Sequence, residues 1–269
     1  MFSPAKGLLA GVCTLAGLAL TAGQARAEAT PITIFGYDVS ITVQGATASA
    51  YQGSKHYSGF PSISIAATRP GHYDDFGAPD DSPSIVLWEN DTVQVGGSGN
   101  FIADRGNSHA LVGMKDLAWA GEGGGFFNWW PQPWMRVRVE ALRGLWSEDG
   151  WLVNGAADFV TRKGPFILSA GPRINLADAA YNDFYFGVTP AEAVTSLHYK
   201  TAFSPGASPL TGGVEAAVEY AWHDRWRFDL SANYDRILGQ DANSPIVRLT
   251  GSPNQYSIAG GVRFMLSKP

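Results

Sequence analysis

The chain has 269 residues, of which 45% are hydrophobic, 12% aromatic and 16% charged, and its formal net charge is −5. Phosphate binding requires a basic face, so this acidic balance argues against nucleic acid as a partner. The single cysteine, Cys13, lies in the N-terminal segment described next, so the rest of the chain has no thiol for a disulfide, a zinc-thiolate site or cysteine catalysis.

The first 27 residues have the pattern of a secretory signal peptide. A lysine precedes residues 7–22, an uncharged apolar stretch that is too short for a comfortable membrane helix. Ala25 and Ala27 then form the small-x-small pattern of a signal-peptidase site. We therefore expect cleavage before Glu28, export of the protein, and a single domain over residues 28–269.

The exported part reads as a series of strands separated by turns. No apolar run in it is long enough to cross a membrane as a helix. A segment at 199–203 decides whether the count is odd or even, and because single-chain bacterial barrels have even counts we favour about twelve. The other predicted strands cover residues 38–50, 62–68, 84–88, 92–102, 117–126, 133–142, 150–161, 166–175, 210–222, 226–235 and 255–266.

The clearest of these strands is 226–235, where apolar and polar residues alternate strictly. Trp226, Phe228, Leu230 and Tyr234 share one face, and the charged and polar residues between them share the other. Aromatic residues at both ends of an apolar face are typical of a transmembrane β-barrel, with lipid outside and polar groups inside. We therefore predict an all-β, antiparallel barrel in the outer membrane.

The connections between strands predict which end of the barrel is which. Residues 222–226 form a minimal turn, as expected on the periplasmic side, whereas residues 239–254 are long and polar, as expected of an outer loop. Residues 73–82 and 105–115 are predicted to be further loops. Residues 176–196 fit neither a strand nor a simple turn.

Charged residues on the inward faces of the predicted strands are the first candidate site. They could line a selective, water-filled passage, or they could close a narrow lumen by pairing, because unpaired buried charges are costly. We favour the closed or narrow lumen. The candidates are Arg136, Arg138, Glu140, Asp158, Arg173, Glu215, Glu219, Arg227, Asp229, Asp235 and Arg263.

Three other groups of residues receive plain structural interpretations. The acidic residues Asp74, Asp75, Asp80 and Asp81 match no calcium loop, so we predict a solvated surface loop and no metal site. The aromatic residues between Phe126 and Trp134 are expected to form an interface belt. The five histidines lack a serine-hydrolase or metal-binding pattern, so we predict no catalytic residue and no cofactor. The histidines are His56, His72, His109, His198 and His223.

Several short motifs resemble the MipA/OmpV family, the MltA-interacting protein family of outer-membrane proteins. The most specific are Tyr-Phe-Gly-Val-Thr at 185–189, Asp-Ala-Asn-Ser-Pro-Ile-Val at 241–247 and Gly-Ser-Pro-Asn-Gln at 251–255. Residues 171–173, 181–182, 51–54 and 60–61 fit the same pattern. The resemblance spans most of the exported chain. It departs from the usual barrel at the C-terminus, where residues 265–269 follow the aromatic Phe264.

This resemblance implies a scaffold rather than an enzyme. The best-known member of the family brings a lytic transglycosylase together with a murein synthase, so both enzymes are expected partners in peptidoglycan remodelling, beside outer-membrane lipid. The contact surface is expected on periplasmic turns. A candidate interaction segment contains Tyr181, Asn182, Tyr185 and Phe186. The alternative function is a small-solute outer-membrane channel.

Overall fold

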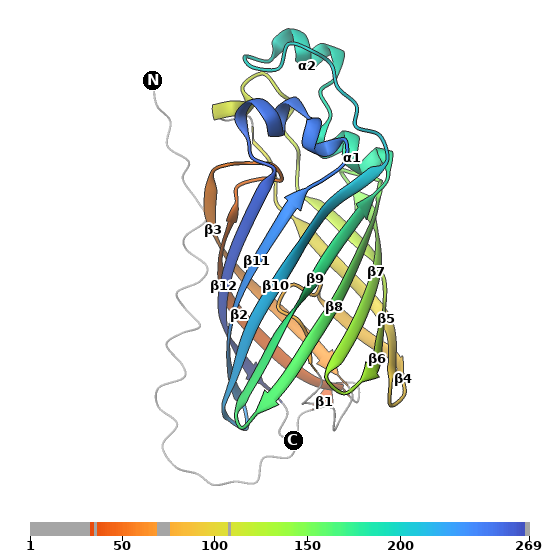
Figure 1. Ribbon diagram of the computed structural model, residues 1–269, viewed down its shortest axis with the longest axis vertical. Helices are drawn as coiled ribbons and strands as arrows, with labels where there is room; N and C mark the ends of the chain where they lie inside the picture. The colour runs from red at the N-terminus through yellow and green to blue at the C-terminus, as the bar shows by residue number, and fades with distance from the viewer. Residues whose placement is uncertain (1–32, 35–36, 69–75, 107–108, 267–269) are drawn as a thin grey trace. The chain divides into compact units, whose positions relative to one another are not determined.

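Eleven strands close into a ring in the part of the chain that the computed structural model describes, residues 33–34, 37–68, 76–106 and 109–266 (Figure 1). A further two-residue strand, β1 (Thr33–Ile34), pairs with β2 alone. The ring consists of β2 (Tyr37–Ser49), β3 (Tyr57–Thr68), β4 (Ser84–Glu89), β5 (Val93–Ile102), β6 (Ala120–Gln132), β7 (Met135–Trp146), β8 (Trp151–Lys163), β9 (Phe166–Ala177), β10 (Ser208–His223), β11 (Trp226–Ile237) and β12 (Asn254–Met265).

The alternation that predicts the strands also sets which side chains face outward. In β11, Trp226, Phe228 and Leu230 are 37%, 39% and 54% exposed, whereas Asp229 between them is 8% exposed. The same pattern recurs around the ring and leaves an apolar outer surface. A surface of this kind requires lipid around it, because water would not cover so many large apolar side chains favourably. The predicted all-β barrel is therefore confirmed.

The ring has an odd number of long strands, which requires one parallel junction. Strands that alternate in direction close evenly only when their number is even. Here β2 pairs with β12 on one side and β3 on the other, all antiparallel, while β3 and β4 run parallel and share the single pair Ala67↔Ile85. The candidate strand at 199–203 is not a strand, since only Phe203 forms a bridge, to Val188. The predicted count of twelve is therefore not established.

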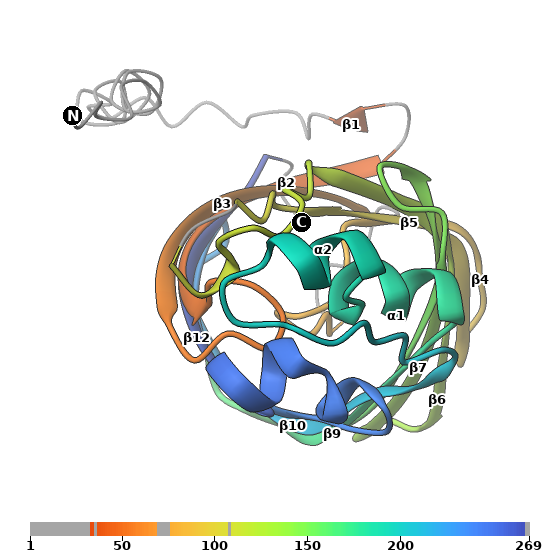
Figure 2. The same cartoon turned by 90° about the horizontal axis from the view of Figure 1, so that it is seen from above.

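The two ends of the barrel differ in the length of their connections. Tight turns join β6 to β7, β8 to β9 and β10 to β11 at one end, which we call the turn end. The opposite end, the loop end, carries η1 (His109–Leu111), α1 (Ala179–Phe186), α2 (Pro190–Thr195), η2 (Asp241–Asn243) and η3 (Ile246–Thr250) (Figures 1 and 2). By the usual rule for such barrels, we expect the turn end to be periplasmic.

The helices of the loop end form a cap over the barrel mouth (Figure 2). Asp178 caps α1 by accepting from the Tyr181 amide, and Thr189 with Glu192 forms a capping box at α2. Tyr181, Tyr185 and Phe186 pack with apolar residues of β8, β10 and β11 in one buried cluster. None of the helices among the described residues has the length and apolar character needed to span a membrane.

The position of β6 differs from the prediction of residues 117–126. The strand runs over Ala120–Gln132. The sequence does not show these bounds, because three consecutive glycines hide the alternation of apolar and polar side chains. Phe127 and Trp129 face outward, as does Trp134 in the following turn, and these three fit an interface belt. Phe126 does not belong to that belt, since it is 4% exposed and faces the lumen beneath a guanidinium group.

Candidate functional site

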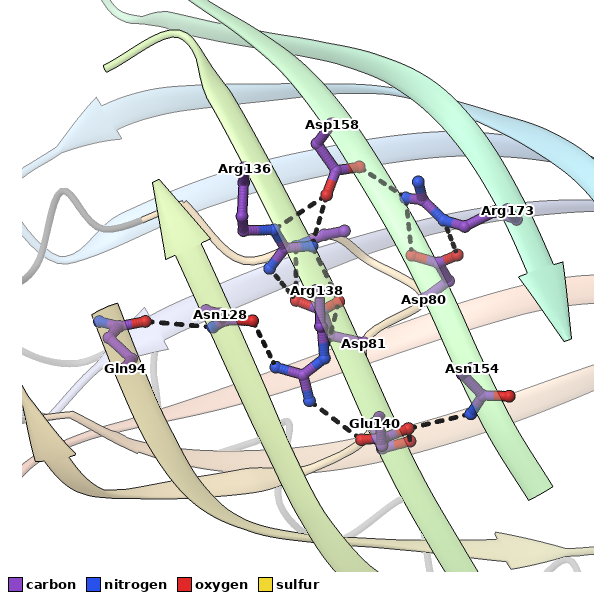
Figure 3. Close-up of polar contacts among 12 residues, drawn as sticks. Asp80, Asp81, Gln94, Asn128, Arg136, Arg138, Glu140, Asn154, Asp158 and Arg173 are labelled. Atoms are coloured by element: carbon purple, nitrogen blue, oxygen red, sulfur yellow. Dashed lines mark hydrogen bonds and ion pairs between the residues drawn. The ribbon is translucent and has the colours of Figure 1, made fainter. Parts of the chain in front are cut away.

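Residues 76–83 lie inside the barrel and form what we call the lumen plug. The segment precedes β4, and its Ala78–Asp81 turn is closed by a bond from the Asp81 amide to the Ala78 carbonyl, with Pro79 at the position that favours such a turn. The Asp81 carboxylate also accepts from the Ala78 amide. This local fold directs the Asp80 and Asp81 carboxylates toward arginines on the barrel wall (Figure 3).

Arg136 of β7 joins the lumen plug to the wall. Its side chain is 1% exposed, and it donates to Asp158 of β8 from Nε at 2.9 Å and from Nη2 at 2.7 Å. It also holds both oxygens of Asp81, with Nη2 at 2.9 Å from Oδ1. A planar guanidinium group between two carboxylates is a strong, directional ion pair.

Arg173 of β9 makes the second connection between wall and plug. Its Nε and Nη2 donate to Asp80 at 2.7 and 3.1 Å, and Nη2 lies 2.8 Å from Asp158. Glu215 of β10 accepts from the same nitrogen. Asp158 thus bridges the two arginines that hold the plug (Figure 3).

Arg138 extends the network along β7. It pairs with Glu140 at 3.0 Å, donates to Asn128 at 3.2 Å and lies 3.5 Å from Asp81. Its guanidinium group also stacks over the Phe126 ring, 4.2 Å from the centroid. The Ser82 hydroxyl of the plug donates to Glu140 at 2.8 Å, which adds a third link between plug and wall.

Four of the remaining predicted lumen charges, Glu219, Arg227, Asp229 and Arg263, lie on the turn-end side of the lumen plug, whereas Asp235 of β11 lies on the loop-end side, beneath α1. Glu219 pairs with Arg227 at 2.6 Å and with Arg263 at 3.0 Å. Asp229 is buried near them. A cavity of about 20 Å³ at this level is lined by Phe76, Gly77 and Pro79 of the plug as well as by Asp229 and Arg263. The plug therefore occupies part of the lumen here.

The prediction of a solvated acidic loop is wrong for Asp80 and Asp81. Both carboxylates are bound by buried arginines within the barrel. Asp74 and Asp75 lie outside the described residues. No group of three or more metal-ligating side chains occurs among the residues whose placement is described.

The candidate interaction segment is also placed differently from the expectation. Tyr181, Asn182, Tyr185 and Phe186 are buried, and they lie in α1 at the loop end, which we expect to face away from the periplasm. The Tyr181 hydroxyl accepts from Gln52 at 2.9 Å, and the Asn182 amide donates to the Gly206 carbonyl at 2.9 Å. Burial raises the pKa of both tyrosine hydroxyls. These residues fix the cap and offer no exposed surface to a partner.

Other predicted residues are placed without forming a site. His56, His198 and His223 are exposed. Ala25, Ala27 and Glu28 lie outside the described residues, so the cleavage site remains a prediction. In the cap, Asp241 accepts a hydrogen bond from the Ser208 hydroxyl at 2.8 Å, and burial raises the pKa of its carboxyl group to about 6.

Comparison with known proteins gives one family match. The family model described as "MltA-interacting protein MipA" matches residues 41–266. No curated protein matches the chain in sequence.

Solved structures that resemble the chain include outer-membrane barrels. The chain is similar to an outer membrane channel from Pseudomonas putida F1, with 8% identity over 90% of this chain and 100% of that one, and a TM-score of 0.42. It is similar to a bacterial polysaccharide outer membrane secretin, with 9% identity, 87% and 99% coverage and a TM-score of 0.42. The KdgM porin has 9% identity, 84% and 98% coverage and a TM-score of 0.39.

Proposed function

Because the chain belongs to the MltA-interacting protein MipA family of outer-membrane β-barrel proteins, we propose that it is a scaffold which holds a lytic transglycosylase and a murein synthase together at the outer membrane. The partners would be bound at the turn end, since that end faces the periplasm and its murein. The barrel itself would perform no chemistry.

The lumen plug is the observation that supports this proposal over a channel. Asp80 and Asp81 tie the lumen plug to Arg136 and Arg173, all within the barrel. Four charge-assisted hydrogen bonds from these arginines to the two carboxylates hold the plug against the wall, so we expect it to stay in place. A barrel plugged in this way presents surfaces to partners rather than a passage to solutes.

Capture of partners from the cell envelope by the tagged barrel tests the proposal. We expect the barrel to retain a lytic transglycosylase and a murein synthase from a mildly solubilised envelope. The double variant His223→Ala/Asp224→Lys at the turn end should lose them, because both residues are exposed there. The matched control Val194→Lys/Leu197→Lys changes exposed residues of the loop end and should retain both enzymes.

The competing channel hypothesis has a direct test of its own. A small-solute channel should conduct ions in a planar bilayer and should change its ion selectivity when Arg136 and Arg138 are made neutral. A silent bilayer together with retained murein enzymes agrees with the scaffold. Steady conductance of the unaltered barrel without partner capture would refute it.

A further inference from the structure

The lumen is partly occupied by the lumen plug but hollow between the plug and the cap. Two cavities of about 280 and 220 Å³ lie there. Asn154, Asn175 and Asp235 line both of them, so the two are adjacent, and we call them together the outer chamber. Its larger part is near the lower end of the range for small-molecule sites, roughly 300–1,000 Å³.

The outer chamber has an apolar roof and a polar floor. Tyr181 and Phe186 of α1 form the roof with Leu152, Leu210 and Ile237 of the strands. The floor consists of polar and charged groups from the plug and wall, namely Asp80, Asp81, Ser82, Asn100, Arg138, Glu140, Arg173 and Asn233. A ligand that fits must therefore offer an apolar face on one side and hydrogen-bonding groups on the other.

Four buried oxygen atoms of residues that line the outer chamber have no hydrogen-bond partner among the residues that the structure describes. They are Ser49 Oγ, Gln52 Oε1, Asn233 Oδ1 and Asp235 Oδ1. A buried polar atom without a partner costs about 1–3 kcal/mol, so such atoms mark a place where a partner belongs. Oxygen acceptors are satisfied by donors, which a hydroxyl-rich molecule supplies in number.

The wall of the outer chamber is weakest between β2 and β12. The ladder between these strands extends from Met265↔Ser40 to Ile258↔Thr47. Beyond that pair Ser49 and Ser257 border the chamber, and no register pair joins the two strands within the described residues. Tyr234 and Tyr256, whose rings are 5.1 Å apart, lie at the same level, as interface aromatics do.

We propose that the outer chamber binds a small, uncharged, hydroxyl-rich molecule the size of a mono- or disaccharide. Its hydroxyl groups donate to the four unpartnered oxygens, and its carbon–hydrogen face packs beneath Tyr181 and Phe186. This site is independent of partner binding at the turn end. Asp235 is its central acceptor, since it lines both parts of the chamber.

The test uses the purified barrel in a detergent that has no sugar headgroup. Glucose, N-acetylglucosamine and maltose are the probes, and saturation-transfer NMR measures their contact with the protein. We expect saturation to be transferred from the barrel to the protons of at least one of these sugars. The variant Asp235→Leu should raise its Kd by at least about tenfold, because it removes one charge-assisted hydrogen bond and fills space.

Asp229→Leu is the matched control. Asp229 lies on the same strand and face, and both of its carboxylate oxygens are also buried without partners, but it lines the small turn-end cavity. It should leave the Kd unchanged. A second measurement does not depend on folding of the leucine variants. In Ser257→Cys, with Cys13 replaced by serine, the bound probe should slow thiol labelling.

Three outcomes would overturn the proposal. The first is no transfer to any probe and no protection of the thiol in a folded barrel, which would leave a water-filled space. The second is an equal loss of affinity in Asp235→Leu and Asp229→Leu. The third is binding of glucosamine without binding of the neutral sugars, which would indicate a cation site.

Discussion

Replacing Asp80 and Asp81 together by asparagine should release the lumen plug from the wall while the barrel stays folded. Four hydrogen bonds run from guanidinium groups to these two carboxylates, two from Arg136 and two from Arg173. Each arginine keeps acceptors on the wall after the change, namely Asp158 for both and Glu215 for Arg173. No arginine is therefore left without a partner.

The expected size of the effect follows from these bonds. A hydrogen bond to a charged group contributes about 1.5–3 kcal/mol, and asparagine keeps one of two acceptor oxygens, so roughly half of the four bonds are lost. Asp80 is 31% exposed, and solvent weakens its share. We expect a loss of about 3 kcal/mol in the free energy that holds the plug, which corresponds to a rise on the order of 100-fold in the released fraction.

Thiol labelling at position 78 measures this release. Ala78 is 6% exposed within the plug. With Cys13 replaced by serine, Ala78→Cys introduces a single buried thiol. Its labelling rate follows the released fraction when opening is fast relative to the reaction. The double asparagine variant should label on the order of 100 times faster than the Ala78→Cys barrel alone.

Asp158→Asn is the control for this experiment. It changes the same network on the wall side, and its contacts are with Arg136 and Arg173 rather than with the plug. Labelling at position 78 should not rise, because both arginines keep their bonds to the plug. An unchanged rate in the folded double variant, or an equal rise in Asp158→Asn, would refute the reasoning.

Three further predictions concern stability. Arg136→Ala should lower the free energy of unfolding by about 3 kcal/mol, because Asp81 and Asp158 together lose four hydrogen bonds and keep only Arg138 and Arg173 as ion-pair partners; an unchanged denaturant midpoint would contradict this. Burial raises the pKa of Asp241 to about 6, so the folded protein keeps this proton to a higher pH than the unfolded chain does. The free energy of unfolding should therefore fall as the pH rises from about 4 to 6. Asp241→Asn should flatten this pH dependence in thermal melts. Gly113→Ala should destabilise the cap, since Gly113 has φ +86° and an added Cβ would lie 2.3 Å from the Thr195 carbonyl oxygen. The rate at which a protease cleaves the cap should rise in this variant.

The barrel follows from the sequence because a strand shows its two faces directly. The predicted strand at 226–235 is observed as Trp226–Ile237, and the inward charges Arg136, Arg138 and Arg173 are buried where the alternation puts them. Alternation fails where glycines remove one face, as in β6, and there the inward position of Phe126 was missed.

The lumen plug could not be predicted for a different reason. Alternation tells which face of a strand is inward, but it says nothing of where a connection travels. The strands already carry three acidic residues, Glu140, Asp158 and Glu215, that pair with the three arginines of the wall. The strand charges alone therefore give no sign that the arginines also bind carboxylates from another segment. The segment at 176–196 likewise shows no clear pattern in the sequence, because helix α1 depends on packing with distant strands.

The parallel junction between β3 and β4 has a consequence for assembly. Since these strands are neighbours in the ring, the segment that joins them begins and ends at one seam. It can swing into the lumen as a loop, without any chain end having to be threaded through a finished barrel. The last contact to form can therefore be the short one at Ala67 and Ile85, after the loop is already inside. If a tight antiparallel turn joined these two strands instead, no connecting segment would be long enough to enter the lumen.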